Sequence, residues 1–327
     1  MAFIDEMLAG CTRVAILGHV RPDGDCVGSC LGLYNYIRDN HPQVQADVYL
    51  KEFSAAFGYL RYVDSVLHQL MLGEERVYDL CVCLDASDEE RLGDFAVLRQ
   101  KARRSVCVDH HVTNTKYAGE NHVCPTASST CEFLFSMLDE ESIGKETAEC
   151  LYTGIIHDTG VFKHSNTTKT TMETAGKLIS KGIDFSTIID DSFYRKSYVQ
   201  NQILGRALLE SVIFLDGRCI FTAIRQKDMD FYGVTGKDLD GIVDQLRVTE
   251  GVEVAIFLYE TGAGEYKVSM RSNHDVDVSR IAVMFGGGGH VKAAGCTMRG
   301  TVYDVINNLS VQIEKQIRQV EKECTRA

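Results

Sequence analysis

Four short stretches rich in aspartate and histidine each follow an apolar or helical segment, and this pattern constrains the fold more than any other feature of the sequence. The first, 18–29, reads Gly-His-Val-Arg-Pro-Asp-Gly-Asp-Cys-Val-Gly-Ser and lies between a short apolar run and a helical pattern. His19, Asp23 and Asp25 therefore lie on a predicted strand-to-helix turn. Such turns share one edge of an α/β sheet, so side chains from several of them can meet there.

The same arrangement recurs where two later apolar runs end. One run ends in Asp85, and the next ends in Asp109, His110 and His111. Asp85 taken alone also fits a helix cap. Three consecutive residues that can bind a metal ion or transfer a proton are hard to explain by packing when they follow a buried strand. Because adjacent side chains on an extended segment point to opposite sides, one histidine can bind a metal ion while its neighbour has another role.

A fourth acidic position, Asp158, follows a helical pattern over 146–156. The adjacent His157 could also bind a metal ion, although a surface or outer position is commoner for such a histidine. The candidate metal ligands contain too many carboxylates for one ion and suit a pair of ions that share a carboxylate. These ligands are His19, Asp23, Asp25, Asp85, His110 and Asp158. Oxygen-rich ligation with two imidazoles favours Mn²⁺, with Mg²⁺ as the other possibility.

The order of apolar runs predicts an α/β chain, and its 327 residues are enough for two domains. We expect an N-terminal catalytic domain over 1–191 with a mainly parallel sheet and helices on both faces, then a linker helix over 192–211. A smaller mixed α+β domain follows over 212–327. Within the first domain we expect a charged helical passage from about 51 to 75 and a loop from 114 to about 124.

The expected second domain contains four consecutive glycines, 286–289, followed by His290. Glycines let the backbone approach a ligand closely and expose amides to an anion. The run matches neither a Walker loop nor the dinucleotide fingerprint, and a flexible turn is the simpler interpretation of the glycines alone. His290, together with Arg271 on a preceding strand, favours a clamp for a phosphate or a base. The chain should end in a solvated helix.

Composition limits the classes of function. The formal net charge of −12 argues against a large basic face for long nucleic acid, but bound cations can attract a small phosphorylated substrate. No apolar run approaches the ~20 residues of a membrane helix, and no secretory signal is visible, so we expect a cytoplasmic protein without a membrane partner. The 12 cysteines include no Cys-x-x-Cys pair, which argues against structural zinc.

These stretches resemble the motifs of the DHH phosphoesterase superfamily. The similar segments are His19-x-x-x-Asp23-x-Asp25, Leu84-Asp85-x-Ser87, Asp109-His110-His111-x-x-Asn114 and Gly154-Ile155-Ile156-x-Asp158-Thr159-Gly160. The segment Gly286-Gly287-Gly288-Gly289-His290-x-x-Ala293-Ala294-Gly295 resembles the glycine motif of the DHH-associated C-terminal domain. The resemblance spans nearly the whole chain in the right order and is greatest to the small stand-alone members.

The resemblance implies a role for each residue. One metal ion would be bound by His19, Asp23 and Asp85, and the other by Asp25, Asp85, His110 and Asp158, so that Asp85 bridges them. Asp109 would orient a neighbouring histidine, and His111 would contact the scissile phosphate and assist proton transfer. A remote phosphate or terminal nucleotide would be held by Arg271, His290 and the amides of Gly287, Gly288 and Gly289. His157 departs from the family pattern, which usually has a smaller residue there.

The implied activity is hydrolysis of short oligoribonucleotides and of 3′-phosphoadenosine 5′-phosphate by a phosphodiesterase that uses two Mn²⁺. The alternative is a phosphodiesterase for cyclic di-AMP or the linear dinucleotide pApA. An inorganic pyrophosphatase would share the motifs of the first domain but lack this glycine-rich second domain. The complete set of metal ligands argues against a silent nucleotide sensor. The implied partners are short RNA or a small nucleotide, not long duplex nucleic acid, and a homodimer is left open.

Overall fold

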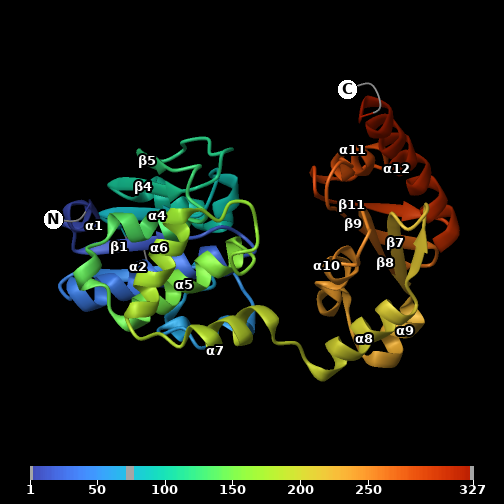
Figure 1. The fold of residues 1–327 in the computed structure, drawn as a ribbon. Coiled ribbons are helices and arrows are strands. Elements are labelled where there is room, and N and C mark those ends of the chain that lie inside the picture. Colours follow the sequence, from blue (N-terminus) through green and yellow to red (C-terminus); the bar gives the residue numbers. More distant parts are fainter. Residues whose placement is uncertain (1–2, 71–76, 325–327) are drawn as a thin grey trace. The chain divides into compact units, whose positions relative to one another are not determined.

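The computed structural model describes residues 3–70 and 77–324 and divides into two compact units, Met1–Arg195 and Lys196–Ala327 (Figure 1). The first unit is built on a parallel sheet with the strand order β2-β1-β3-β4-β5. Its strands are β1 Arg13–Leu17, β2 Gln45–Tyr49, β3 Leu80–Leu84, β4 Arg104–Asp109 and β5 Glu120–Val123. The parallel α/β sheet expected from the sequence is thus confirmed.

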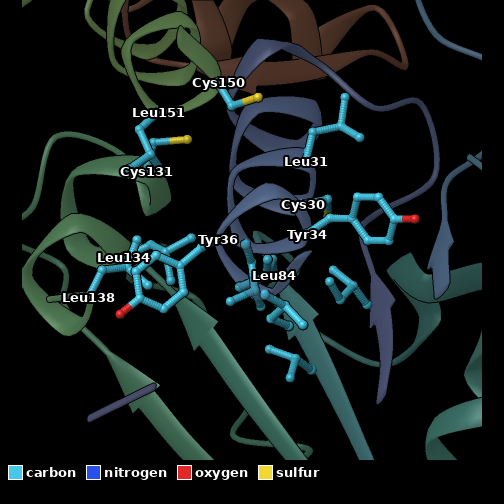
Figure 2. Close-up of a cluster of buried hydrophobic side chains, with 14 of the residues drawn as sticks. Cys30, Leu31, Tyr34, Tyr36, Leu84, Cys131, Leu134, Leu138, Cys150 and Leu151 are labelled. Carbon is cyan, nitrogen blue, oxygen red and sulfur yellow. The ribbon is translucent and has the colours of Figure 1, made fainter. Parts of the chain in front are cut away.

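Helices cover both faces of this sheet, because its strands are apolar on both sides. The helices of the first unit are α1 Phe3–Leu8, α2 Gly24–Asn40, α3 Ala96–Lys101, α4 Thr130–Met137, α5 Lys145–Asp158, α6 Lys169–Ser180 and α7 Phe185–Ile189. Val14, Ile16 and Val82 face a large core that contains side chains of α2, α4 and α5, and Figure 2 shows side chains of these helices meeting beside the strands. Leu17 and Cys83 face a smaller core on the other side.

Small residues let α2 and α5 pack closely. A Cβ added to Gly28 of α2 would lie 2.5 Å from the carbonyl oxygen of Cys150 of α5, and one added to Gly154 of α5 would lie 2.7 Å from Oδ1 of Asp25 of α2 and 2.2 Å from Sγ of Cys131 of α4. Real Cβ atoms do not approach other atoms so closely. The glycines therefore set the spacing between α2, which begins at the candidate site, and α5, which ends there.

The second unit is a mixed sheet with the order β10-β11-β9-β8-β7-β6, in which only β7 and β8 pair in parallel. Its strands are β6 Val212–Phe214, β7 Cys219–Ile224, β8 Val254–Gly262, β9 Glu265–Ser272, β10 Gly288–His290 and β11 Ala293–Arg299. Its helices are α8 Tyr198–Leu209, α9 Gln226–Tyr232, α10 Ile242–Arg247, α11 Val278–Met284 and α12 Val302–Cys324. Side chains of α8, α9 and α10 pack on one face of the sheet, and those of α11 and α12 on the other.

Three local expectations were wrong. The helical passage expected from 51 to 75 forms two short 3₁₀ turns, Ala55–Phe57 and Val63–Ser65, and its last residues, 71–75, lie outside the described part. The loop expected from 114 to 124 contains β5, which extends the sheet. The terminal helix is not simply solvated, because Leu309 and Ile313 of α12 are fully buried in the core. None of the helices in the described ranges is long and apolar enough to cross a membrane.

The linker helix expected over 192–211 is not continuous. A π-helical segment, Asp190–Tyr194, ends at Arg195, which has extended backbone angles, and α8 begins after a cap at Ser197. Ile203 of α8 is buried with the side chains of α9 and α10, so this helix belongs to the second unit. The functional domain boundaries at 191 and 212 stay a prediction.

Candidate functional site

The candidate site lies at the carboxyl ends of the parallel strands, where the strand order reverses between β1 and β3. This reversal is where open α/β sheets bind their ligands. His19 follows β1, Asp85 follows β3 and His110 follows β4. The first turn of α2 adds Asp25, and the last residue of α5 is Asp158. The topology therefore brings together residues that are far apart in the sequence.

Asp85 lies at the centre of this group and is 1% exposed. Its Oδ2 atom lies 3.4 Å from Nε2 of His19, and its Oδ1 atom lies 3.7 Å from Nε2 of His110. The hydroxyl of Thr130 donates a hydrogen bond of 3.0 Å to Oδ1. A left-handed backbone angle, φ = 57°, turns the chain sharply at Asp85. Each carboxylate oxygen thus faces a different imidazole, as a bridging ligand requires.

His19 is held with one ring nitrogen directed into the site. Its Nδ1 atom lies 2.8 Å from the carbonyl oxygen of Val20, so the hydrogen must be on Nδ1 for this hydrogen bond to form. Its Nε2 atom then faces Oδ2 of Asp23 at 3.7 Å. The other oxygen of Asp23 caps α2 by accepting from the backbone of Asp25 and Cys26. Burial acts to lower the pKa of His19, but the neighbouring carboxylates, Asp23 first, raise it overall.

Asp25, His110 and Asp158 form the other half of the group. Nε2 of His110 lies 3.1 Å from Oδ2 of Asp158 and 4.0 Å from Oδ2 of Asp25. Asp25 is fully buried, and its two oxygens accept hydrogen bonds from the backbone N–H groups of Thr130 and Cys131 at 2.6 and 2.9 Å. The first turn of α4 therefore fixes this carboxylate.

The electrostatics of these carboxylates fit a site for divalent cations. Burial, followed by the charges of Asp85 and Asp158, raises the pKa of Asp25 well above its usual range. Burial together with Asp85 and Asp23 raises the pKa of Asp158 to about 8. Carboxylates buried this close together repel one another, and a cation between them would remove the repulsion. The donors, carboxylate oxygens and imidazole nitrogens, are ligands that divalent transition metals accept.

His111 lies beside this group and is oriented by Asp109. Nδ1 of His111 lies 2.7 Å from Oδ1 of the buried Asp109, and Nδ2 of Asn114 donates to the other oxygen at 2.6 Å. The hydrogen bond that His111 donates to Asp109 raises the pKa of His111. Nδ1 of His111 also lies 3.6 Å from Oδ1 of Asp85. This arrangement holds one ring nitrogen and leaves Nε2 for proton transfer or for a ligand.

The side chain of His157 contacts Ser192 and two aromatic rings. Its Nε2 atom lies 3.2 Å from Oγ of Ser192, and its ring contacts Phe57 and Phe193 with centroid distances of 5.1 and 5.4 Å. Burial lowers its pKa to about 4. Gly24 leaves the room for this ring, because a Cβ there would lie 2.2 Å from it. Packing between α2 and the segment before α8 therefore explains a histidine at this position.

In the second unit, Arg271 and His290 share one transverse row of the sheet. Arg271 of β9 pairs with Ala293 of β11, which in turn pairs with His290 of β10. Residues directly opposite in an antiparallel sheet face the same side. Arg271 lines a small pocket of about 100 Å³ on this face. The structure thus places two of the expected substrate contacts on one surface of the second unit.

The glycine run forms a strand edge and not a free loop. Gly288 and Gly289 belong to β10 and pair with β11. A Cβ on Gly287 would lie 2.1 Å from the carbonyl oxygen of Gly295, and Gly289 has φ = 144°, which other residues rarely adopt. Close strand contact therefore requires these two glycines, and Gly288 has open space around it.

Two residues near the expected contacts were missed from the sequence. Thr130 donates to both Asp25 and Asp85, and the only signal for it was the polar start of the helix that follows Ser129. Asp244 accepts a hydrogen bond of 3.1 Å from Nε of Arg271, and no motif in the sequence indicated it.

Comparisons with known proteins find matches to family models in both units of the chain. Residues 13–155 match the DHH family, N-terminal domain, and residues 217–319 match the DHHA1 domain. The bifunctional oligoribonuclease and PAP phosphatase NrnA of Thermus thermophilus is 29% identical over 317 residues, which cover 96% of this chain and 91% of that protein. The cyclic-di-AMP phosphodiesterase PdeA of Listeria monocytogenes is 26% identical over 314 residues, 90% of this chain but 46% of that protein. The crystal structure of an exopolyphosphatase-related protein from Bacteroides fragilis has a TM-score of 0.84 and 25% identity, and the match covers 95% of this chain and 94% of that one.

Proposed function

Because this chain belongs to the DHH family and carries a DHHA1 domain in its second unit, we propose that it hydrolyses very short oligoribonucleotides and 3′-phosphoadenosine 5′-phosphate. The observation that carries the proposal is the position of Asp85, whose two oxygens face His19 on one side and His110 on the other. The substrate class is supported by the similarity to a bifunctional oligoribonuclease and PAP phosphatase along 96% of the chain.

The chemistry of the donor set supports a pair of Mn²⁺ ions. We assign His19, Asp23 and Asp85 to one ion, and we assign Asp25, Asp85, His110 and Asp158 to the other. Two imidazoles in the set suit Mn²⁺ better than Mg²⁺, which prefers an all-oxygen shell. Such a pair, when bound, activates a water molecule and neutralises charge on the phosphoryl oxygens.

The remaining residues position the substrate and move a proton. Asp109 holds His111 at Nδ1 with a contact of 2.7 Å, so that Nε2 can exchange a proton with an oxygen of the scissile phosphate. Arg271 and His290 would bind the substrate's remote phosphate through charge-assisted hydrogen bonds. Exonucleolytic cleavage, a cytoplasmic location and a homodimer stay predictions of the same proposal.

Hydrolysis of three substrates measured in parallel tests the proposal. A short 5′-phosphorylated RNA, 3′-phosphoadenosine 5′-phosphate and cyclic di-AMP are each incubated with the protein and Mn²⁺, and then with Mg²⁺. We expect turnover of the first two, and faster turnover with Mn²⁺. Selective hydrolysis of cyclic di-AMP would favour the phosphodiesterase alternative, and no hydrolysis of any of the three would contradict both.

A pair of variants connects the activity to the site. Asp85→Asn should lower kcat by about 10²–10³-fold or more, because it removes the charge shared by both halves of the group. Asp94→Asn is the matched control, since Asp94 is exposed and pairs with Lys51 and not with a residue of this group. Near-normal activity of Asp85→Asn would refute the bridging role.

A further inference from the structure

We propose that Asp244 is a positioning residue that orients Arg271 toward the remote phosphate of the substrate. The inference rests on the proposed function, because it takes Arg271 as a substrate contact. Nε of Arg271 donates to Oδ1 of Asp244 at 3.1 Å, and Nη1 donates to the carbonyl oxygen of Met270 at 3.2 Å. These two bonds fix the plane of the guanidinium group.

The hydrogen bonds that Arg271 makes in the structure leave one edge of its guanidinium group available to a phosphate. A guanidinium group has five N–H donors, and an oxyanion binds well to two parallel donors on one edge. Asp244 occupies Nε, and Met270 occupies one hydrogen of Nη1. The end of the group formed by Nη1 and Nη2 has no hydrogen-bond acceptor among the described residues other than Met270. Asp244 therefore orients Arg271 without taking the edge that a phosphate would use.

Asp244 is itself held in place by the fold. It lies on α10, whose Ile242, Val243 and Leu246 are buried in the core of the second unit. Its Oδ1 atom also lies 3.9 Å from Nε of Arg247. The helix thus presents the carboxylate from a fixed position, so that Asp244 can restrain a long side chain that would otherwise sample many rotamers.

The backbone that carries Arg271 is also constrained. The buried carboxylate of Glu253 accepts hydrogen bonds from the backbone N–H groups of His274, Asp275 and Val276 at 2.8–3.3 Å. This turn follows β9 directly, so the strand end that carries Arg271 cannot shift easily. A rigid backbone and an anchored guanidinium group together give a preorganised contact, which lowers the entropic cost of binding an anion.

The negative charge of Asp244 also repels an incoming phosphate. Asp244 is about half exposed, and water screens its repulsion of a phosphate at the far edge of the guanidinium group. Its hydrogen bond to Arg271 is direct and charge-assisted. We therefore expect its removal to weaken binding of the remote phosphate.

Steady-state kinetics of two variants test this inference with 3′-phosphoadenosine 5′-phosphate as the substrate. Asp244→Asn should raise KM about five- to tenfold and change kcat less than twofold, and Asp244→Glu should recover part of the loss because it keeps the charge. Asp216→Asn is the matched control, since Asp216 is exposed in the turn between β6 and β7 of the same unit. Thermal unfolding of each variant shows whether the fold is intact.

A double-mutant cycle separates positioning from general electrostatics. In the Arg271→Ala background, Asp244→Asn should have no further effect on KM, because its partner is gone. A lower KM in Asp244→Asn, or an equal increase with and without Arg271, would overturn the inference. Failure of the unaltered chain to hydrolyse the substrate would instead contradict the proposed function, so the two failures are distinguishable.

Discussion

The metal-free protein should lose stability as the pH rises, and Asp158 should account for a measurable part of that loss. Burial and the charges of Asp85 and Asp23 raise its pKa from 3.8 to about 8. Asp158 also lies at the C-terminus of a 14-residue helix, where the helix dipole disfavours a negative charge. We therefore expect Asp158→Asn to reduce the pH dependence of unfolding when metal ions are removed.

The size of the effect follows from proton linkage. A carboxyl group whose pKa is raised by folding stabilises the folded state most below its unfolded pKa, and this contribution is lost as the pH rises toward the folded value. At 1.36 kcal/mol per pKa unit, the loss for Asp158 amounts to about 2 kcal/mol at pH 5 and about 6 kcal/mol at pH 9. The unaltered chain should therefore lose about 4 kcal/mol more than Asp158→Asn between these two pH values.

Urea unfolding in EDTA at a series of pH values measures this difference directly. Asp94→Asn should behave like the unaltered chain, because Asp94 is exposed and pairs with Lys51 and not with a residue of the site. Saturating Mn²⁺ should stabilise the unaltered chain more at high pH, since the ion binds the ionised carboxylate. Identical pH dependence of the unaltered chain and Asp158→Asn in EDTA would refute the reasoning.

Two further predictions concern residues that hold the site in place. Gly154→Ala should destabilise the protein by about 2 kcal/mol or more, because its Cβ would lie 2.2 Å from Cys131 Sγ. Gly176→Ala is the control, since a Cβ at this helix position has nothing within 4 Å. In the same urea titration it should stabilise the protein by about 0.5–1 kcal/mol. Asp109→Asn should lower kcat sharply while Mn²⁺ affinity by calorimetry changes little, since Asp109 orients His111 through Nδ1. Loss of Mn²⁺ binding in this variant would assign Asp109 to the metal ligands instead.

The sequence predicted the strand ends well because a buried parallel strand is a continuous apolar run. The prediction for Asp85 needed only such a run and the carboxylate after it. Because parallel strands end at one shared edge of the sheet, it followed that Asp85 lies near the residues that end the neighbouring strands. The helix starting near Asp23 was equally clear, since proline and glycine break the chain beside a capping aspartate. Local signals of this kind depend on a few neighbouring residues.

Contacts between distant segments could not be predicted in this way. Thr130 contacts Asp25 and Asp85 only because α4 packs beside α2. The hydrophobic periodicity of the sequence does not indicate which helices pack side by side. The strand β5 was missed because Glu120–Val123 is short and half exposed, so its pairing with β4 depends on a partner strand more than on its own composition. Asp244 meets Arg271 through the packing of α10 on β9, which is likewise a tertiary contact.

The packing of α2 against α5 connects the stability of the first unit to the chemistry of its site. The two helices approach closely through Gly28 and Gly154, and the same approach brings Asp25, at the start of α2, near Asp158, at the end of α5. Burying two like charges together costs stability in the metal-free protein. The apolar contacts along α2 and α5 must offset that cost, because they hold the carboxylates in place before any cation binds. A larger side chain at either glycine would relieve the repulsion by separating the helices, and it would at the same time destroy the arrangement that a divalent cation needs.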